Sequence, residues 1–141
     1  MKKVIAWIED DIDALAPVME PLIERGFTFK KFRTYQQALD NVGTLRSCDL
    51  IILDLILPPG KSTETDEDDY LGAKLLRRLR DELRVKTPIL IFSVVAHASD
   101  VLPDSELKKY DVRAEFKPIR QERLMRAVHE LIGIPFEPDE D

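Results

Sequence analysis

The sequence predicts an α/β protein with one doubly wound, parallel five-stranded sheet that carries helices on both faces. Strand-type runs alternate with helix-type patterns along the whole chain, and the connections between them are short. The run LIIL at residues 50–53 is aliphatic at every position, which is typical of a strand buried on both faces. The length of 141 residues suits one domain with one core. The predicted strands are residues 4–8, 27–32, 49–54, 88–93 and 112–116.

Composition and charge narrow the class of protein. With 44% hydrophobic residues, 34% charged residues and a net charge of -6, the chain is typical of a globular protein and not of a general nucleic-acid binder. Cys48 is the single cysteine, which excludes an internal disulfide and fits a reducing compartment. The apolar stretch at 4–8 is too short for a signal-peptide core, and no run approaches the roughly 20 apolar residues that span a bilayer. We therefore expect a soluble cytoplasmic protein that acts neither on nucleic acid directly nor at a membrane.

The first predicted helix lies at residues 13–26, between the strands at 4–8 and 27–32. It contains Pro17 and Pro21, and a proline inside a helix costs on the order of 3 kcal/mol because it removes a backbone hydrogen bond and crowds the preceding turn. We therefore expect a kink or a late start in this helix.

The second predicted helix, at residues 34–43, has the clearest helical pattern in the chain. Thr34 is suited to cap its amino end, and Gly43 is expected to end it. Apolar residues recur with the spacing of one helix face. They are Tyr35, Ala38, Leu39 and Val42.

Three further helices are predicted along the rest of the chain. The one at 70–83 has a leucine stripe, and its arginines are assigned to the opposite, solvent face. The region 96–111 has a poor apolar stripe and is interrupted by Pro103, so a short or broken helix is expected there. The last helix follows Pro118 and ends at Gly133. The arginines assigned to solvent are Arg77, Arg78 and Arg80.

Asp54 stands directly after the aliphatic run, where an ionised carboxylate is costly unless it has partners or lies at an open strand end. In a doubly wound sheet of order 2-1-3-4-5, as in flavodoxin, ligands bind beyond the carboxyl ends of the strands, where the strand order reverses. We predict this order, which makes the first and third strands neighbours. The strands near that point then bring five polar residues to the same edge of the sheet: Glu9, Asp10, Asp54, Ser93 and Lys117.

The carboxylates in this set repel one another, since two like charges ~4 Å apart at an effective dielectric of ~20 cost about 4 kcal/mol. A cation makes the cluster tolerable, and an all-oxygen site with few protein ligands suits Mg2+. Lys117 would hold a phosphoryl group by its charge, and Ser93 would hold it by a hydrogen bond. Asp54 is then the candidate nucleophile, which would form an aspartyl phosphate.

Four short motifs carry a family resemblance, namely IEDD, IILDLILPPG, ILIFS and EFKPI, in this order along the chain. Together they resemble the receiver domain of two-component response regulators, which has a CheY-like, flavodoxin-like fold. The resemblance covers residues 1–133 and leaves a short tail at 134–141, which is expected to be loosely packed.

The resemblance also implies a role for each site residue. Asp54 is the phosphoacceptor, and it binds Mg2+ together with the acidic pair Glu9 and Asp10. Ser93 takes the place of the switch Ser/Thr of the family. Lys117 matches the lysine that precedes a cis-proline bond.

The chain departs from the family pattern at several places. An acidic insertion occupies residues 59–70, where the family has a very short loop, and its composition favours a solvated loop. Ala114 stands where the family often carries an aromatic switch residue, and Val94 stands where a smaller residue is common. Ile56 and Val95 take the positions that flank the phosphoryl group. Because neither side chain can orient an attacking water, we predict slow self-dephosphorylation.

The expected function is that of a receiver that takes a phosphoryl group from a phosphohistidine, on a histidine kinase or a phosphotransfer protein. Its output would pass to a downstream protein or through a homodimer. An alternative, favoured by Ala114, Val94 and the insertion, is a receiver-like binding module that signals without phosphorylation. A phosphohydrolase of the haloacid-dehalogenase type is disfavoured, because such enzymes need a second aspartate where Ile56 stands. His97 and His129 have no supporting motif and are expected at the surface.

Overall fold

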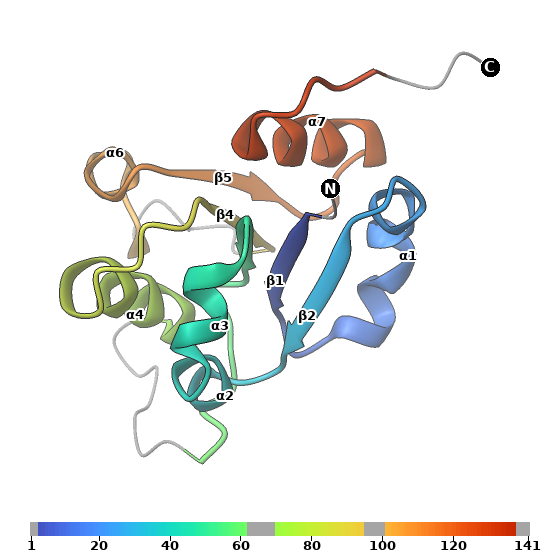
Figure 1. Ribbon diagram of the computed structural model, residues 1–141. Helices are drawn as coiled ribbons and strands as arrows, with labels where there is room; N and C mark the ends of the chain where they lie inside the picture. The colour runs from blue at the N-terminus through green and yellow to red at the C-terminus, as the bar shows by residue number, and fades with distance from the viewer. Residues whose placement is uncertain (1–2, 62–69, 95–100, 138–141) are drawn as a thin grey trace.

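The computed structural model describes residues 3–61, 70–94 and 101–137, which form one five-stranded parallel sheet of order β2-β1-β3-β4-β5. Figure 1 shows the strands in the middle of the molecule, with helices on both sides. The predicted fold class and strand order are therefore confirmed. The strands are β1 (Val4–Ile8), β2 (Thr28–Phe32), β3 (Leu50–Leu53), β4 (Ile89–Ser93) and β5 (Val112–Phe116).

The helical segments of the described residues are α1 (Ile12–Glu24), α2 (Tyr35–Leu39), α3 (Val42–Ser47), α4 (Leu71–Arg77), the π-helical turn η1 (Arg78–Glu82), α6 (Asp104–Tyr110) and α7 (Gln121–Ile132). α1 and α7 cover one face of the sheet, and α2, α3, α4 and α6 lie on the other. Neighbouring residues of β1 alternate between the two layers, so that Trp7 packs on the α1 side and Ile8 on the opposite side. The core is thus divided by the sheet into two layers.

The central strands are buried along their whole length. Every residue of β3 and β4 is buried, as expected of strands with neighbours on both edges and helices on both faces. β1 and β3 pair in register from Ile5 with Leu50 to Ile8 with Leu53. This register places the residues that follow β1 and β3 side by side at the carboxyl end of the sheet.

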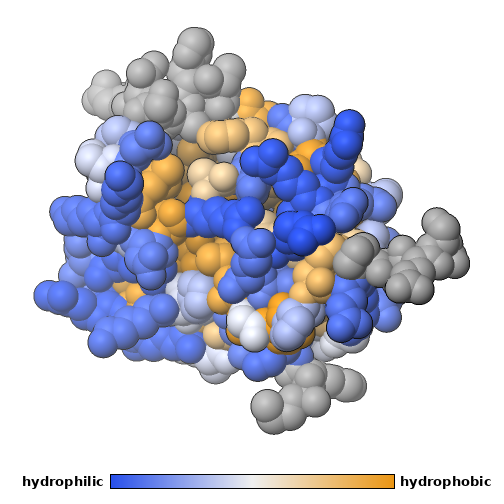
Figure 2. Space-filling view, turned by 90° about the horizontal axis from the view of Figure 1, so that it is seen from above, coloured by the Kyte–Doolittle hydropathy of each residue, from blue (hydrophilic) through white to orange (hydrophobic). Residues whose placement is uncertain are grey.

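The face of the molecule on the side of α7 is mainly polar (Figure 2). Figure 2 views the molecule from above, the side on which α7 lies in Figure 1, and hydrophilic side chains cover most of this face. Glu122, Arg126 and Glu130 of α7 are exposed. Within the described residues, no helix is both long enough and apolar enough to cross a membrane.

α1 runs without a break through both of its prolines. It begins at Ile12, so of the two expected outcomes the late start is wrong, and the kink stays a prediction. Because Pro21 has no N–H group, the carbonyl oxygen of Pro17 lacks its usual partner within the helix. This oxygen instead accepts a hydrogen bond from Nε2 of Gln121, in α7, at 3.3 Å. The contact with the neighbouring helix offsets part of the cost of the prolines.

The helix predicted at 34–43 is divided into α2 and α3, and Gly43 lies inside α3 and does not end a helix. The predicted cap is confirmed, since Oγ1 of Thr34 accepts a hydrogen bond from the N–H of Gln37 at 3.0 Å. At the other end of α2, Nδ2 of Asn41 donates to the carbonyl oxygen of Gln37 at 2.7 Å. This side-chain bond replaces the backbone bond of a further helical turn, and a new helix begins after it.

The arginines of α4 and η1 were assigned to the solvent face, and this assignment is wrong for Arg77 and Arg80, which bind other segments of the chain. Arg80 is partly buried and donates to three backbone carbonyl oxygens at 2.7–3.0 Å, two of them at Val85 and Thr87 in the approach to β4. Burial lowers the pKa of its guanidinium. Arg77 donates to the carboxylate of Glu106, in α6, at 3.0 Å. These side chains fasten α4 and η1 to the segments around β4.

α6 begins at Asp104, directly after Pro103, and has 7 residues, which agrees with the expected short helix. Val95 and His97 lie outside the described residues, as do residues 62–69 of the acidic insertion. The solvated-loop interpretation of that insertion therefore stays a prediction.

His129 is buried in α7, with 5% of its surface exposed, so the expected surface position is wrong. The chain that follows α7 contributes to this burial. The ring of Phe136 lies 5.2 Å from the ring of His129 in an edge contact, and the carbonyl oxygen of Pro135 lies 3.2 Å from Nδ1 of His129. Ile134 and Phe136 of the tail therefore pack against the domain, contrary to the expected loose packing, and residues 138–141 lie outside the described residues.

Candidate functional site

The carboxyl ends of four strands bring together the residues predicted for the site. They are Glu9 after β1, Asp54 after β3, Ser93 at the end of β4 and Lys117 after β5. Backbone hydrogen bonds continue past the strands, because the N–H of Asp54 donates to the carbonyl oxygen of Ile8 at 3.0 Å. In the same way, the N–H of Lys117 donates to the carbonyl oxygen of Ser93 at 2.9 Å. The sheet thus fixes the backbone from which these side chains project.

Both oxygens of the Asp54 carboxylate accept hydrogen bonds. Oδ1 accepts from the hydroxyl of Ser93 at 2.8 Å and from the N–H of Ile56 at 2.9 Å. Oδ2 accepts from Nζ of Lys117 at 2.9 Å. Asp54 is only 5% exposed, and these three donors offset the cost of burying its charge. The structure therefore supplies the partners that the position of Asp54 in the sequence requires.

Lys117 bridges two carboxylates. Its Nζ contacts Oε1 of Glu9 as well as Oδ2 of Asp54, and the three side chains are at most 10% exposed. Burial disfavours the ammonium form, but the hydrogen bonds to Glu9 and Asp54 outweigh this effect and raise the pKa of Lys117. The sequence analysis did not predict the contact between Lys117 and Glu9. The two residues are 108 positions apart, and no local sequence pattern indicates that such a pair is in contact.

Glu9 is almost fully enclosed, with 2% of its surface exposed. Burial raises the pKa of Glu9 to about 7; the hydrogen bond from Lys117 lowers it in part, and the neighbouring charge of Asp54 raises it. Its second oxygen, Oε2, accepts a hydrogen bond from the N–H of Asp11 at 3.2 Å. A cation near Glu9 would favour the ionised carboxylate.

The acidic residues of the site fit a small divalent cation. Glu9, Asp10 and Asp54 offer carboxylate oxygens that all lie within 4.8 Å of one another. Asp10 is exposed, so the group is open to solvent on one side. A few oxygen ligands with room for water are the donor set that Mg2+ prefers. These three residues would hold the cation that the sequence predicts.

Comparison with known proteins gives a clear result for the fold. The sequence matches no protein-family model and no curated protein. The receiver domain of the Francisella response regulator 1452 is similar, with a TM-score of 0.72 and 21% sequence identity over 93% of this chain and 97% of that chain. A CheY-like response regulator receiver domain protein from Methanospirillum hungatei JF-1 has a TM-score of 0.70 and 18% identity over 94% of this chain and 95% of that chain. The chain has the receiver-domain fold.

A further receiver with this fold is the chemotaxis response regulator CheY4 of Vibrio cholerae, with a TM-score of 0.68 and 20% identity over 93% of this chain and 99% of that chain. The coverage is nearly complete on both sides in all three comparisons. The receiver-domain fold therefore accounts for the whole sheet and the helices on both of its faces.

Within the receiver-domain fold, Gly72 holds α4 against the backbone of the site, and this residue was missed in the sequence. Its N–H donates to the carbonyl oxygen of Leu55 at 2.9 Å. A Cβ atom at Gly72 would lie 2.1 Å from the carbonyl oxygen of Asp54 and 2.5 Å from Cα of Leu55, so no side chain fits. The sequence could have indicated this role, because Gly72 stands inside a helix-type pattern. A glycine there lowers helix stability by about 1 kcal/mol relative to alanine, so another reason for its presence is to be expected.

Aliphatic side chains follow the carboxyl ends of the two central strands, β3 and β4. Ile56 and Val94 are 40% and 57% exposed, respectively. Ala114 lies in β5 and packs, partly buried, against the core. The peptide bond between Lys117 and Pro118 is cis, as the resemblance implied.

Proposed function

We propose that the protein is a response regulator receiver that accepts a phosphoryl group on Asp54, with Mg2+ bound by Glu9, Asp10 and Asp54 itself. The donor would be a phosphohistidine on a histidine kinase or a phosphotransfer protein in the cytoplasm. The observation that carries the proposal is the Asp54 carboxylate, which stands between Ser93 and Lys117 with two further carboxylates within 4.8 Å.

In the proposed reaction, one carboxylate oxygen of Asp54 forms a bond to phosphorus while the phosphorus–nitrogen bond of the donor phosphohistidine breaks. The electron pair of the broken bond stays on the imidazole nitrogen of the donor, which takes up a proton. Bound Mg2+ would neutralise charge on the phosphoryl oxygens and on the carboxylates. The sheet holds Asp54 in place, and the reaction therefore depends on positioning more than on a strong base.

Lys117 and Ser93 already contact Asp54, and they are placed to bind a phosphoryl group attached to it. The ammonium of Lys117 would attract a phosphoryl oxygen by its charge. The hydroxyl of Ser93, which donates to Oδ1 of Asp54 at 2.8 Å, would redirect its hydrogen to a phosphoryl oxygen. This change of partner is the proposed first step by which the signal leaves the site, toward a downstream protein or a second copy of the chain.

Phosphorylation by acetyl phosphate in the presence of Mg2+ tests the proposal. We expect native protein to gain the mass of a phosphoryl group and the variant Asp54→Asn to gain none. Asp111→Asn is the matched control, because Asp111 is exposed and its φ of 55° is a backbone conformation that asparagine tolerates. Undiminished uptake by Asp54→Asn would show that another residue is the acceptor.

A receiver-like binding module that works without phosphorylation is the second candidate. The observation that favours it is the charge of Lys117, which by itself compensates part of the charge of Glu9 and Asp54. Beryllofluoride with Mg2+ mimics an aspartyl phosphate and separates the two candidates. We expect it to change the fluorescence of Trp7 in a receiver and to leave the fluorescence unchanged in a module of the second kind.

A further inference from the structure

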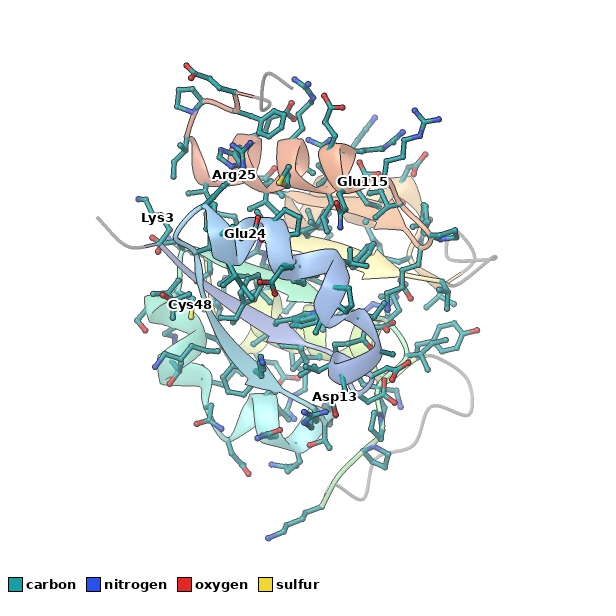
Figure 3. All side chains as sticks on the ribbon, turned by 90° about the vertical axis from the view of Figure 1, so that its right-hand side faces the viewer. Lys3, Asp13, Glu24, Arg25, Cys48 and Glu115 are labelled. Atoms are coloured by element: carbon teal, nitrogen blue, oxygen red, sulfur yellow. The ribbon has the colours of Figure 1, made fainter. Side chains whose placement is uncertain are left out.

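A pocket lies at the amino end of the sheet, at the opposite end from Asp54. Figure 3 shows the two ends, with Lys3 and Cys48, which precede β1 and β3, on the left and Asp13 and Glu115 on the right. The pocket has a volume of about 260 Å³ and lies between η1 and the segments that precede β4 and β5. Its lining residues are Arg80, Arg84, Val85, Lys86, Tyr110 and Asp111.

Arg80 is fixed at the wall of this pocket with one nitrogen left open. Its Nε donates to the carbonyl oxygen of Tyr110 at 3.0 Å, and its Nη1 donates to those of Val85 and Thr87 at 2.7 and 2.9 Å. Tyr110 and Val85 line the pocket, so the guanidinium is held among the lining residues. Within the described residues, Nη2 makes no hydrogen bond, and it is not among the buried side-chain atoms that lack one. Nη2 is therefore accessible, and it offers two hydrogens to a ligand.

The positive charge of Arg80 is only partly compensated by the protein. In the part of the chain that the structure describes, no carboxylate forms an ion pair with its guanidinium. Asp81, the next residue, instead accepts a hydrogen bond from the hydroxyl of Tyr110 at 2.8 Å. Burial lowers the pKa of the Arg80 guanidinium, and the charge of Asp111 offsets this effect only in part. An anion in the pocket would stabilise the charged guanidinium.

Arg84 has a backbone conformation in which glycine would be more stable. It follows η1 with a φ of 54°, in the left-handed region where helices commonly end with glycine because a Cβ atom is crowded there. The N–H of Val85 donates to the carbonyl oxygen of Leu79 at 2.7 Å, which fixes this turn. The side chain of Arg84 is exposed and has no hydrogen bond or ion pair within the described ranges. The arginine therefore costs stability without adding a contact to the fold, and this points to a role in binding.

Lys86 supplies the third cation of the pocket. Its side chain is exposed, and like that of Arg84 it has no ion pair among the residues that the structure describes. Three cations thus line the pocket against one carboxylate, that of Asp111, which leaves a surplus of two positive charges. Val85 and Tyr110, which are buried, add apolar surface beside these charges. The pocket therefore suits a ligand with two negative charges and an apolar part.

We propose that this pocket binds a phosphoryl dianion, the form that a phosphate monoester takes above its second pKa of about 6. Its three terminal oxygens would face Nη2 of Arg80, the guanidinium of Arg84 and the ammonium of Lys86. A carboxylate, with two oxygens and one charge, would leave one of these cations without a partner. The volume corresponds to about nine water molecules at ~30 Å³ each, so part of the organic group of an ester would fit against Val85 and Tyr110. The proposal does not depend on phosphorylation of Asp54.

Titration with phenyl phosphate at pH 8, without Mg2+ and at constant ionic strength, tests the proposal. The backbone N–H signals of Lys86 and Asp111, which line the pocket from two segments, should shift saturably in nuclear magnetic resonance spectra. Phenyl sulfate has the same shape but one negative charge fewer, so it should bind about tenfold more weakly. Inorganic phosphate, measured in the same way, tells a site for esters from one for free phosphate by which of the two binds more tightly.

Arg84→Gly separates binding from folding. It should weaken the binding of phenyl phosphate about tenfold, and it should not lower the midpoint of urea unfolding, because glycine adopts this φ without strain. Lys86→Met should also weaken binding about tenfold, whereas Lys31→Met, at an exposed position of β2, should leave it unchanged. Unchanged binding by Arg84→Gly, or signals that phenyl phosphate does not shift, would overturn the proposal. Equal affinity for phenyl sulfate would overturn it in favour of a general attraction of anions.

Discussion

Asp54 receives hydrogen bonds from a hydroxyl, a backbone N–H and an ammonium group, and each donor comes from a different part of the chain. The sequence predicted that Asp54, Ser93 and Lys117 share one edge of the sheet, because the carboxyl ends of parallel strands lie together. It did not predict which atoms pair, and it missed the contact between Glu9 and Lys117. Such pairs depend on the twist of the sheet and on side-chain rotamers, which leave no trace in a local pattern.

The exchange of Lys117 for methionine removes a positive charge from between two buried carboxylates. We expect the free energy of unfolding to fall by about 3 kcal/mol, because Glu9 and Asp54 lose their common partner. Mg2+ should restore part of the loss, since it binds the folded site and not the unfolded chain. Urea titrations with and without Mg2+ measure both effects, and Lys31→Met is the surface control. An unchanged unfolding curve for Lys117→Met would contradict this account of the ion pair.

Ile56 is the residue whose replacement should shorten the lifetime of the phosphorylated state. Its side chain is 40% exposed, and its N–H donates to Oδ1 of Asp54, so the side chain stands beside the reacting group. Ile56→Asn adds groups that can orient an attacking water, and we expect phosphate loss to become several-fold faster. Ile23→Asn, at a 46% exposed position of α1, is the matched control. Equal rates in native protein and both variants, at equal Mg2+, would show that Ile56 does not limit hydrolysis.

At the scale of elements, hydrophobic periodicity predicted the strands well, and β5 has the bounds that the sequence indicated. The differences arise where one side chain decides the course of the backbone. Asn41 separates α2 from α3 by a bond to a backbone carbonyl, and Gln121 satisfies the carbonyl that the prolines of α1 leave free. In the first contact, a side-chain amide competes with the backbone N–H groups for a carbonyl oxygen, and helix propensities do not predict which of them binds it. The second contact joins residues 104 positions apart. The hydrophobic periodicity of the sequence therefore predicts neither of these two contacts.

Gly72 and Gly43 provide a matched pair of helix glycines with opposite expectations. Gly72→Ala should lower the free energy of unfolding by about 3 kcal/mol or more, because the new Cβ meets the backbone of Asp54 and Leu55. Gly43→Ala should raise it by about 0.5–1 kcal/mol, because among the described residues outside the backbone of α3 a Cβ at this position would meet nothing within 4 Å, and alanine favours a helix. Urea titration of the two variants measures both changes. A stable Gly72→Ala protein would mean that α4 is free to move away from the site.

The whole molecule presents different chemistry at the two ends of its sheet. The carboxyl end carries the carboxylates and Lys117, and the sequence indicated these residues but not the contact between Glu9 and Lys117. The amino end carries the pocket beside Arg80 and a smaller pocket beside His129, and the sequence indicated neither of them. Ile134, in the chain that follows α7, is one of the residues that line the smaller pocket, and a segment without periodicity gives no sign of where it will pack.

Phe136 should make a measurable contribution to the stability of the whole domain. Its ring contacts His129, and the guanidinium groups of Arg25 and Arg126 lie 4.9 and 5.0 Å from its centre, so it links α1 to α7. We expect Phe136→Ala to lower the free energy of unfolding by about 2 kcal/mol. Phe116→Ala removes a ring that is 48% exposed and should have a smaller effect. An unchanged thermal unfolding curve for Phe136→Ala would show that this ring adds nothing to the stability of the fold.

Four leucines of the segment from α4 to the residue after η1 are spaced four residues apart, and the π-helical turn keeps them on one face of the helix. In a regular α-helix, a step of four residues overshoots a full turn by about 40°, so repeated steps would carry the last leucine around the axis. In η1 the hydrogen bond reaches one residue further, from the N–H of Leu83 to the carbonyl oxygen of Arg78 at 2.9 Å, and this wider turn rotates the next side chain back. Leucines packed in one cluster are the result: Leu71, Leu75, Leu79 and Leu83. The leucine stripe predicted the helix, and the π-helical turn near its end is what keeps the last of these leucines in line with the first.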